Sequence, residues 1–187
     1  MRIRLKPKIN EALDFLKGMN PNDPYHLVAI GEGIRPNTAT FSNEETPAMV
    51  AWVIEQNKNK RNIYFHVNPL NDGIKNRKAK KHDIKHVVAF HVDVDDPSKA
   101  ALDRIQNYLP RPTAIIFSGG GYQAFWLLKE PMTDFEKAET INKSIARELG
   151  GDSCHNLDRI MRVPGTINWP NAKKRAAGRV EALAYVI

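Results

Sequence analysis

An apolar run that ends in two alternate aspartates constrains this chain more than any other stretch of its sequence. The run spans residues 87–95, Val-Val-Ala-Phe-His-Val-Asp-Val-Asp, and Pro97 follows closely. Read as a β-strand, its even-numbered residues are all apolar and share one face, which can pack on helices. Asp93 and Asp95 share the opposite face, with their Cα atoms about 6.5–7 Å apart. The run therefore predicts a strand that presents two carboxylates at its end.

Two interpretations of this acidic strand end are open. The first is a solvated strand end that runs into the Asp96-Pro97 turn. The second is a divalent-metal site, because two carboxylates on one face repel each other unless a cation lies between them. His91 shares the same face. A structural role, with its hydrogen bonds satisfied, is favoured for it over a role as a metal ligand. The rest of the chain favours the metal site.

Composition limits the class of protein. A chain of 187 residues suits one domain with a sizeable core, and its formal charge of +7 suits a polyanionic partner such as nucleic acid or nucleotide. Cys154 is the only cysteine, so no disulfide framework is expected and the chain reads as cytoplasmic. No apolar run reaches membrane-spanning length and the N-terminus lacks the apolar core of a signal peptide, so no membrane partner is expected.

Strand and helix patterns alternate along the chain, which predicts an α+β fold with a largely antiparallel or mixed sheet and helices on one face. Residues 157–163 read as a last helix or turn, followed by a loop. Strands are expected at 26–30, 38–41, 62–68, 87–95, 113–117, 124–128 and 180–186, and helices at 8–17, 46–59, 98–109 and 133–149.

A glycine-rich turn separates two of the expected strands. It reads Ser118-Gly119-Gly120-Gly121, and Tyr122 and Gln123 open the next strand. Three glycines exceed what a hairpin needs, and without Cβ atoms the backbone N–H groups can approach an anion closely. Ser118 adds a hydroxyl, and the Gln123 amide can bind a phosphate or ribose if it faces the polar side. The alternative is a flexible hairpin tip. A Walker-type loop does not fit, because no Gly-Lys-Ser or Gly-Lys-Thr follows.

A third acidic position follows near the C-terminus. Asp158 precedes two basic residues, Arg159 and Arg162, and by itself it most often marks a surface ion pair. If it lies near Asp93 and Asp95, it completes a two-metal site of the kind that activates a 3′-hydroxyl and stabilises a leaving pyrophosphate. Arg162 would then neutralise a triphosphate.

Basic clusters flank these stretches. One lies in the polar segment 75–81 and contains Lys78, Lys80 and Lys81; the other contains Lys173 and Lys174, with Arg175 and Arg179 nearby. Each is either a solvated surface or an electrostatic contact with a phosphate backbone or triphosphate.

In this order, the stretches resemble the motifs of the archaeo-eukaryotic primase superfamily, and above all the RepB-like primase–polymerase domains of phages and plasmids. Residues 91–95 are similar to the Asp-x-Asp motif, residues 118–126 to the nucleotide-binding second motif, and residues 157–168 to the third motif and its downstream loop. Each motif alone is weakly specific, whereas the ordered set is fairly specific. The resemblance covers the chain from about residue 25 to the C-terminus.

The resemblance implies one primase–polymerase catalytic domain, with an N-terminal αβ unit at 1–85 and an RRM-like catalytic unit at 86–187. It implies template-directed nucleotidyl transfer from NTP or dNTP on single-stranded DNA, with a primer, in a bacterial, phage or plasmid setting. Two Mg²⁺ or Mn²⁺ ions would be bound by Asp93, Asp95 and Asp158. Ser118 with Gly119, Gly120 and Gly121 would hold the triphosphate, and Arg162 would be a second phosphate contact.

Two points temper the resemblance. The second motif usually carries histidine where Gln123 stands; glutamine donates through its amide but carries no charge. Family members often continue into an accessory priming domain or a helicase, so this domain is expected to work alone or as a piece of a longer replication protein.

Two alternatives to a primase–polymerase are open. One is a non-catalytic origin-binding or single-strand-binding module, and the other, less favoured, is a metal-dependent nuclease.

Overall fold

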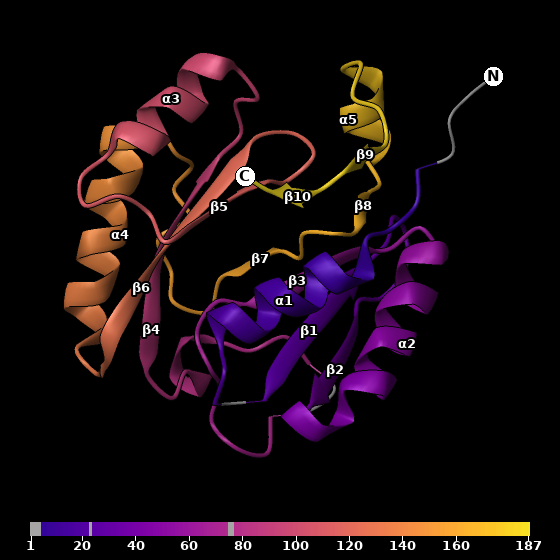
Figure 1. Cartoon of the computed structure of the whole chain (residues 1–187), viewed down its shortest axis with the longest axis horizontal. Helices are drawn as coiled ribbons and strands as arrows, with labels where there is room; N and C mark the ends of the chain where they lie inside the picture. The colour runs from indigo at the N-terminus through magenta and orange to yellow at the C-terminus, as the bar shows by residue number, and fades with distance from the viewer. Residues whose placement is uncertain (1–4, 23, 75–76) are drawn as a thin grey trace.

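The computed structural model describes residues 5–22, 24–74 and 77–187, and it contains two four-stranded antiparallel sheets (Figure 1). The first sheet has the order β2-β1-β3-β7, and its first three strands come from the N-terminal half of the chain. β7 comes from the C-terminal half and pairs with β3, so the two halves share this sheet. Its strands are β1 Tyr25–Ile30, β2 Asn37–Phe41, β3 Asn62–His66 and β7 Ile160–Arg162.

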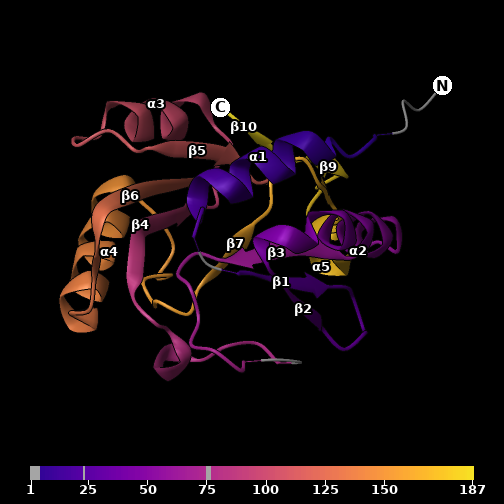
Figure 2. The ribbon, with the colours of Figure 1, turned by 60° about the horizontal axis from the view of Figure 1, so that its bottom comes forward.

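The second sheet has the order β10-β5-β6-β4 and carries the acidic strand end. Helices α3 and α4 cover the face of this sheet that points away from the first sheet (Figures 1 and 2). The second sheet consists of β4 Val87–Val94, β5 Ala114–Phe117, β6 Tyr122–Met132 and β10 Tyr185–Val186; β8 Ile167–Asn168 and β9 Ala182–Leu183 form a separate pair. The helices are α1 Ile9–Met19, α2 Thr46–Lys58, α3 Lys99–Asn107, α4 Phe135–Leu149 and α5 Ala172–Ala176, with single 3₁₀ turns at Asn43–Glu45 and Lys81–Asp83. The predicted α+β class with antiparallel strands is confirmed.

The predicted alternation along β4 holds at its acidic end. Val92 and Val94 are buried in one apolar cluster with Ile105 of α3 and Ile145 of α4. A register shift between Val87 and Ala89 disturbs the start of the strand. Val88 therefore packs against the core between the sheets and not under the helices, contrary to the sequence pattern.

Helix α1 joins the two sheets through Phe15. The Phe15 ring lies edge-on to Phe65 of β3, with 5.3 Å between centroids, and to Phe125 of β6, at 5.7 Å. In the helix predicted at 8–17, Ile9, Leu13 and Leu16 form a single apolar stripe, and Phe15 falls outside it. Two sheets cover this helix, so its buried surface is wider.

Three sequence-based elements differ from the structure. Residues 160–162 form a strand and not a helix or turn, and the expected strand at 180–186 divides between β9 and β10 in different sheets. Helix α4 begins at Phe135, two residues after the predicted start, and the Asp134 side chain caps it by accepting a hydrogen bond from the Lys137 N–H at 3.0 Å. Across the described ranges, no helix is both long and apolar enough to cross a bilayer.

Candidate functional site

Antiparallel pairing of β4 with β6 brings the acidic strand end to the glycine turn. Asp93 lies opposite Gln123, and Val94 lies opposite Tyr122. Gly121 packs so tightly against the end of β4 that a Cβ atom there would overlap the Val94 carbonyl oxygen. The first two predicted motifs therefore meet at one edge of the second sheet.

The glycine turn closes on itself. The Ser118 N–H donates to the Gly121 carbonyl at 2.9 Å, and the Ser118 hydroxyl donates to the same oxygen at 3.1 Å. Gly119 has a φ of +95°, and a Cβ there would lie 2.5 Å from Nδ2 of Asn168. Asn168 in turn donates to the Ser118 carbonyl at 3.0 Å. The turn is thus a shaped structure tied to the third motif's downstream loop, not a free hairpin tip.

The loop after α4 brings a further carboxylate to Asp93. The Asp152 N–H donates to the Asp93 carbonyl at 2.8 Å. Carboxylate oxygens of Asp93 and Asp152 and the Sγ atom of Cys154 all lie within 4.8 Å of one another. Gly151 allows this approach, because a Cβ there would lie 2.5 Å from a Val92 methyl group. The sequence patterns identified neither Asp152 nor Cys154 as a member of this group, because both approach Asp93 only through the packing of the loop after α4.

The charge balance at Asp93 suits a cation. Burial raises the pKa of the Asp93 carboxyl, and the neighbouring carboxylates of Asp152 and Asp95 raise it further. A hydrogen bond from Gln123 and the charge of Arg159, 3.9 Å away, oppose this pKa rise. Oxygen donors of this kind fit Mg²⁺ or Mn²⁺, and the sulfur of Cys154 is a softer donor that Mg²⁺ does not favour.

The two other predicted carboxylates lie in different surroundings. Asp95 forms an ion pair with Arg179, with 2.8 Å between Oδ1 and Nη2. Asp158 accepts a hydrogen bond from the Asn156 amide at 2.5 Å and acts electrostatically on His66 and Lys81. Among the described residues, the one acidic group with metal-ligand spacing contains Asp152 and not Asp158. The structure therefore brings Asp93 together with Asp152 at this edge.

His91 has the structural role. It is buried, and its Nε2 lies 3.1 Å from the Cys154 carbonyl, which can only accept, so Nε2 carries a proton. Its backbone N–H donates to Oδ1 of Asn142 in α4 at 3.1 Å. Burial lowers the pKa of His91 to about 4. These bonds hold the loop after α4 against β4.

Gln123 links the first motif to the third. Its Oε1 accepts the backbone N–H of Arg162 at 2.9 Å, and its side chain hydrogen-bonds Asp93. Gln123 is buried, so in this structure its amide serves the protein and not a phosphate. The sequence offered Gln123 only as a phosphate or ribose ligand. Its contacts with Asp93 and Arg162 depend on how β4 and β7 pack beside it.

Arg162 is a buried cation with spare donors. Its guanidinium lies 4.4 Å from the centroid of the Tyr64 ring, and its Nη2 donates to the Tyr64 hydroxyl at 3.1 Å and to Oδ1 of Asn168 at 3.2 Å. Only 6% of the residue is exposed, and burial lowers its pKa. Within the described part of the chain, its Nε and Nη1 have no hydrogen-bond partner. Buried, unpaired donors of this kind suit an anionic ligand.

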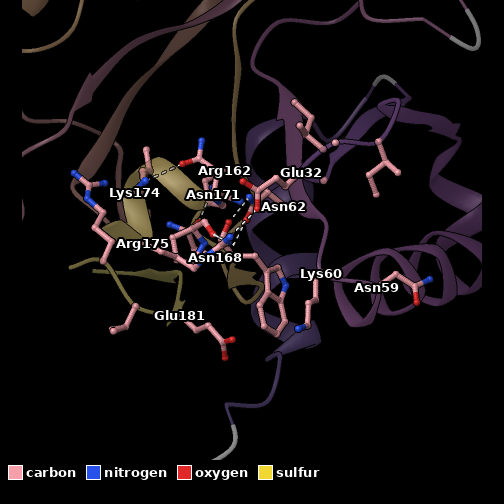
Figure 3. Close-up of a pocket in the computed structure, with 18 of the residues that line it drawn as sticks. Glu32, Asn59, Lys60, Asn62, Arg162, Asn168, Asn171, Lys174, Arg175 and Glu181 are labelled. Atoms are coloured by element: carbon pink, nitrogen blue, oxygen red, sulfur yellow. Dashed lines mark hydrogen bonds and ion pairs between the residues drawn. The ribbon is translucent and has the colours of Figure 1, made fainter. Parts of the chain in front are cut away.

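A cavity of about 1220 Å³ adjoins Arg162 (Figure 3). Its lining is rich in cationic side chains, and the ring of Trp169 contributes an aromatic surface. Arg175 is partly neutralised by Glu32, 3.0 Å away. The cationic residues that line it are Lys60, Arg162, Lys174, Arg175 and Arg179.

The predicted basic residues divide between two regions. Lys174 lines the cavity, and Lys173 is exposed beside it on α5. Lys78 and Lys80 are exposed before β4, and Lys81 forms an ion pair with Glu139 of α4 at 2.8 Å. Residues 75 and 76 of the same basic segment lie outside the described residues.

Three solved structures match this chain. The AEP domain of the cyanophage S-2L primase–polymerase is 18% identical, with 98% of this chain and 91% of that chain covered and a TM-score of 0.70. Primase RepB′ is 15% identical, with 96% and 55% covered and a TM-score of 0.71. The catalytic domain of primase RepB′, solved in complex with initiator DNA, is 14% identical, with 96% and 83% covered and a TM-score of 0.68. The fold is that of an archaeo-eukaryotic-type primase domain.

The family assignment is more specific. The model of the RepB DNA-primase N-terminal domain matches residues 37–184, and the chain belongs to this family. No curated protein matches the sequence. The chain spans 55% of the length of the primase RepB′ chain. Membership places it among proteins of DNA-primase type, within the nucleotidyltransferase class.

Proposed function

We propose that this domain is a DNA-directed primase–polymerase that makes or extends primers on a single-stranded DNA template from NTP or dNTP. The observation that carries the proposal is that an acidic strand end and a shaped glycine turn at one edge of the second sheet adjoin a cationic cavity, which includes residues of the first sheet in its lining. Arg179 lines this cavity and pairs with Asp95. The charge of Asp93 acts on buried Arg162, so the acidic and cationic parts adjoin. Nucleotidyl transfer needs such a combination, because a triphosphate must be held beside divalent cations.

The carboxylates of Asp93 and Asp95 would hold Mg²⁺ or Mn²⁺, with a third carboxylate beside them. The resemblance assigns that role to Asp158, whereas the spacing in the structure supports Asp152. When bound, two such ions lower the pKa of the attacking 3′-hydroxyl and stabilise the leaving pyrophosphate. In this proposal, Cys154 lies beside the metal site and is not one of its ligands.

The cationic side of the site would bind the substrate phosphates. Nε and Nη1 of Arg162 are unpaired and buried, so a phosphate would satisfy both donors. The backbone of the Ser118–Gly121 turn would bind the remaining phosphate oxygens; for this, the Ser118 hydroxyl would have to exchange its bond to Gly121 for one to the ligand. Lys173 and Lys174 beside the cavity, and Lys78, Lys80 and Lys81 before β4, would contact the template or primer backbone.

Incorporation of labelled nucleotide tests the proposal. Primed and unprimed single-stranded templates are incubated with Mg²⁺ or Mn²⁺, and Asp93→Ala/Asp95→Ala is the inactive control. Extension that disappears in the double variant supports the polymerase, and product on the unprimed strand adds primase activity. No incorporation with DNA binding intact would favour a non-catalytic DNA-binding module, or a domain that needs an accessory domain or helicase, and strand scission would indicate a nuclease.

Matched single variants separate the two candidates for the third carboxylate. Asp152→Asn and Asp158→Asn remove the same charge, one within the acidic group and one outside it. We expect Asp152→Asn to lower incorporation by at least tenfold and Asp158→Asn to retain most of it. The opposite ranking would assign the role to Asp158, as the family resemblance implies.

A further inference from the structure

The ion pair between Asp95 and Arg179 connects the two halves of the proposed site. Arg179 lines the cationic cavity, and its Nη2 lies 2.8 Å from Oδ1 of Asp95. Both side chains are partly exposed, at 28% for Arg179 and 46% for Asp95. One guanidinium thus contacts a carboxylate proposed to hold a cation and also lines the space proposed to hold an anion.

We propose that Arg179 is a latch that blocks the metal site until a triphosphate enters the cavity. The inference rests on the proposed function and adds regulation of that same site. While Arg179 is bound to Asp95, a divalent cation must displace a positive charge from its ligand. Phosphate oxygens offer the guanidinium a stronger, doubly hydrogen-bonded partner, and the transfer of Arg179 to them frees Asp95. Binding of triphosphate and binding of metal then favour each other.

The glycine turn is built around the latch. A Cβ atom at Gly120 would overlap Nη1 of Arg179, so the guanidinium occupies space that only glycine leaves free. Gly120 is not among the glycines with positive φ, so alanine fits its backbone and the clash falls on the far end of a flexible side chain. Gly120→Ala therefore displaces the guanidinium without removing its charge.

The expected size of the effect follows from the exposure of the pair. Ion pairs between partly exposed side chains contribute up to about 1 kcal/mol, which corresponds to about fivefold in a dissociation constant. We therefore expect Arg179→Ala to bind Mn²⁺ about two- to fivefold more tightly than wild type when no nucleotide is present. Gly120→Ala should do the same.

Mn²⁺ binding measured by electron paramagnetic resonance, without nucleotide, is the first test. Arg175→Ala is the matched control, because Arg175 lines the same cavity but pairs with Glu32. We expect it to stay within twofold of wild type. A second measurement is calorimetric binding of a non-hydrolysable triphosphate in EDTA. There, Arg179→Ala should weaken binding, and Asp95→Asn should tighten it more in the wild-type background than in the Arg179→Ala background.

The outcomes separate the latch from the proposed function. Unchanged Mn²⁺ affinity in Arg179→Ala and Gly120→Ala, with Mn²⁺ still bound, overturns the latch and leaves the metal site standing. An equal gain in Arg175→Ala also overturns it, because the effect would then be general charge removal. If neither the wild type nor any variant binds Mn²⁺, the proposed metal site fails and the latch fails with it.

Discussion

Replacement of Gln123 by alanine tests the link between the first and third motifs. The Gln123 Oε1 is the acceptor, at 2.9 Å, for the backbone N–H of buried Arg162. Without that acceptor, a buried N–H loses its partner, at a cost of roughly 1–3 kcal/mol. Taking about 2 kcal/mol as the centre of that range, a protein of this size should melt about 4–8 °C lower.

Two comparisons sharpen this test. Gln106 lies on the exposed face of α3, so Gln106→Ala should change the unfolding free energy by less than about 0.5 kcal/mol. Gln123→His should lose less than Gln123→Ala, because a neutral imidazole offers one acceptor to Arg162 and one donor to Asp93. Urea and thermal unfolding give the free energies. Equal stability of Gln123→Ala and Gln106→Ala would refute the claim that this bridge holds the site together.

Three further predictions concern ionisation and the turn. Burial raises the pKa of Asp93, so the charged carboxylate destabilises the metal-free fold at neutral pH. Asp93→Asn removes this charge and should raise the melting temperature in EDTA at pH 7. The gain should fade as the pH falls towards 3.8, because Asp93 is then protonated in both the folded and the unfolded protein. An unchanged melting temperature at pH 7 would contradict this. Burial lowers the pKa values of His66 and His91 to about 4, so each should cost about 1.4 kcal/mol of stability per pH unit between pH 6.5 and 4. Urea midpoints across this range should show a shallower slope in His66→Gln, and an identical slope would count against a neutral, half-buried His66. Gly119→Ala should destabilise the protein by at least about 1–2 kcal/mol, because φ is +95° there and the added Cβ would also clash with Asn168. Calorimetry should show weaker triphosphate binding; wild-type binding would remove the turn from the phosphate site.

Local patterns in the sequence predicted most of the elements that frame the site. The alternation of residues 87–95 predicted β4, and the two strands expected on either side of the Gly-rich turn pair with each other as β5 and β6. The helix predicted at 98–109 forms as α3, and Ser98 caps it by accepting a hydrogen bond from the Ala101 N–H at 3.2 Å. These features depend on neighbours a few residues apart, so the sequence carries them directly.

Contacts between distant segments decided the rest. β7 is three residues long and exists as a strand because β3, about a hundred positions earlier, offers a free edge. Val88 does not lie on its predicted face, because the pairing of β4 with β6 is irregular near the start of β4.

By itself, the sequence determined the family, the α+β class and the two aspartates at the end of a strand, since each is written in residue type and spacing. Only the tertiary structure decided which groups meet those aspartates. Asp152 reaches Asp93 because Gly151 lets the loop after α4 approach β4, and Arg179 reaches Asp95 from beyond α5. Such meetings depend on how separate elements pack, and the spacing of residues along one segment does not encode them.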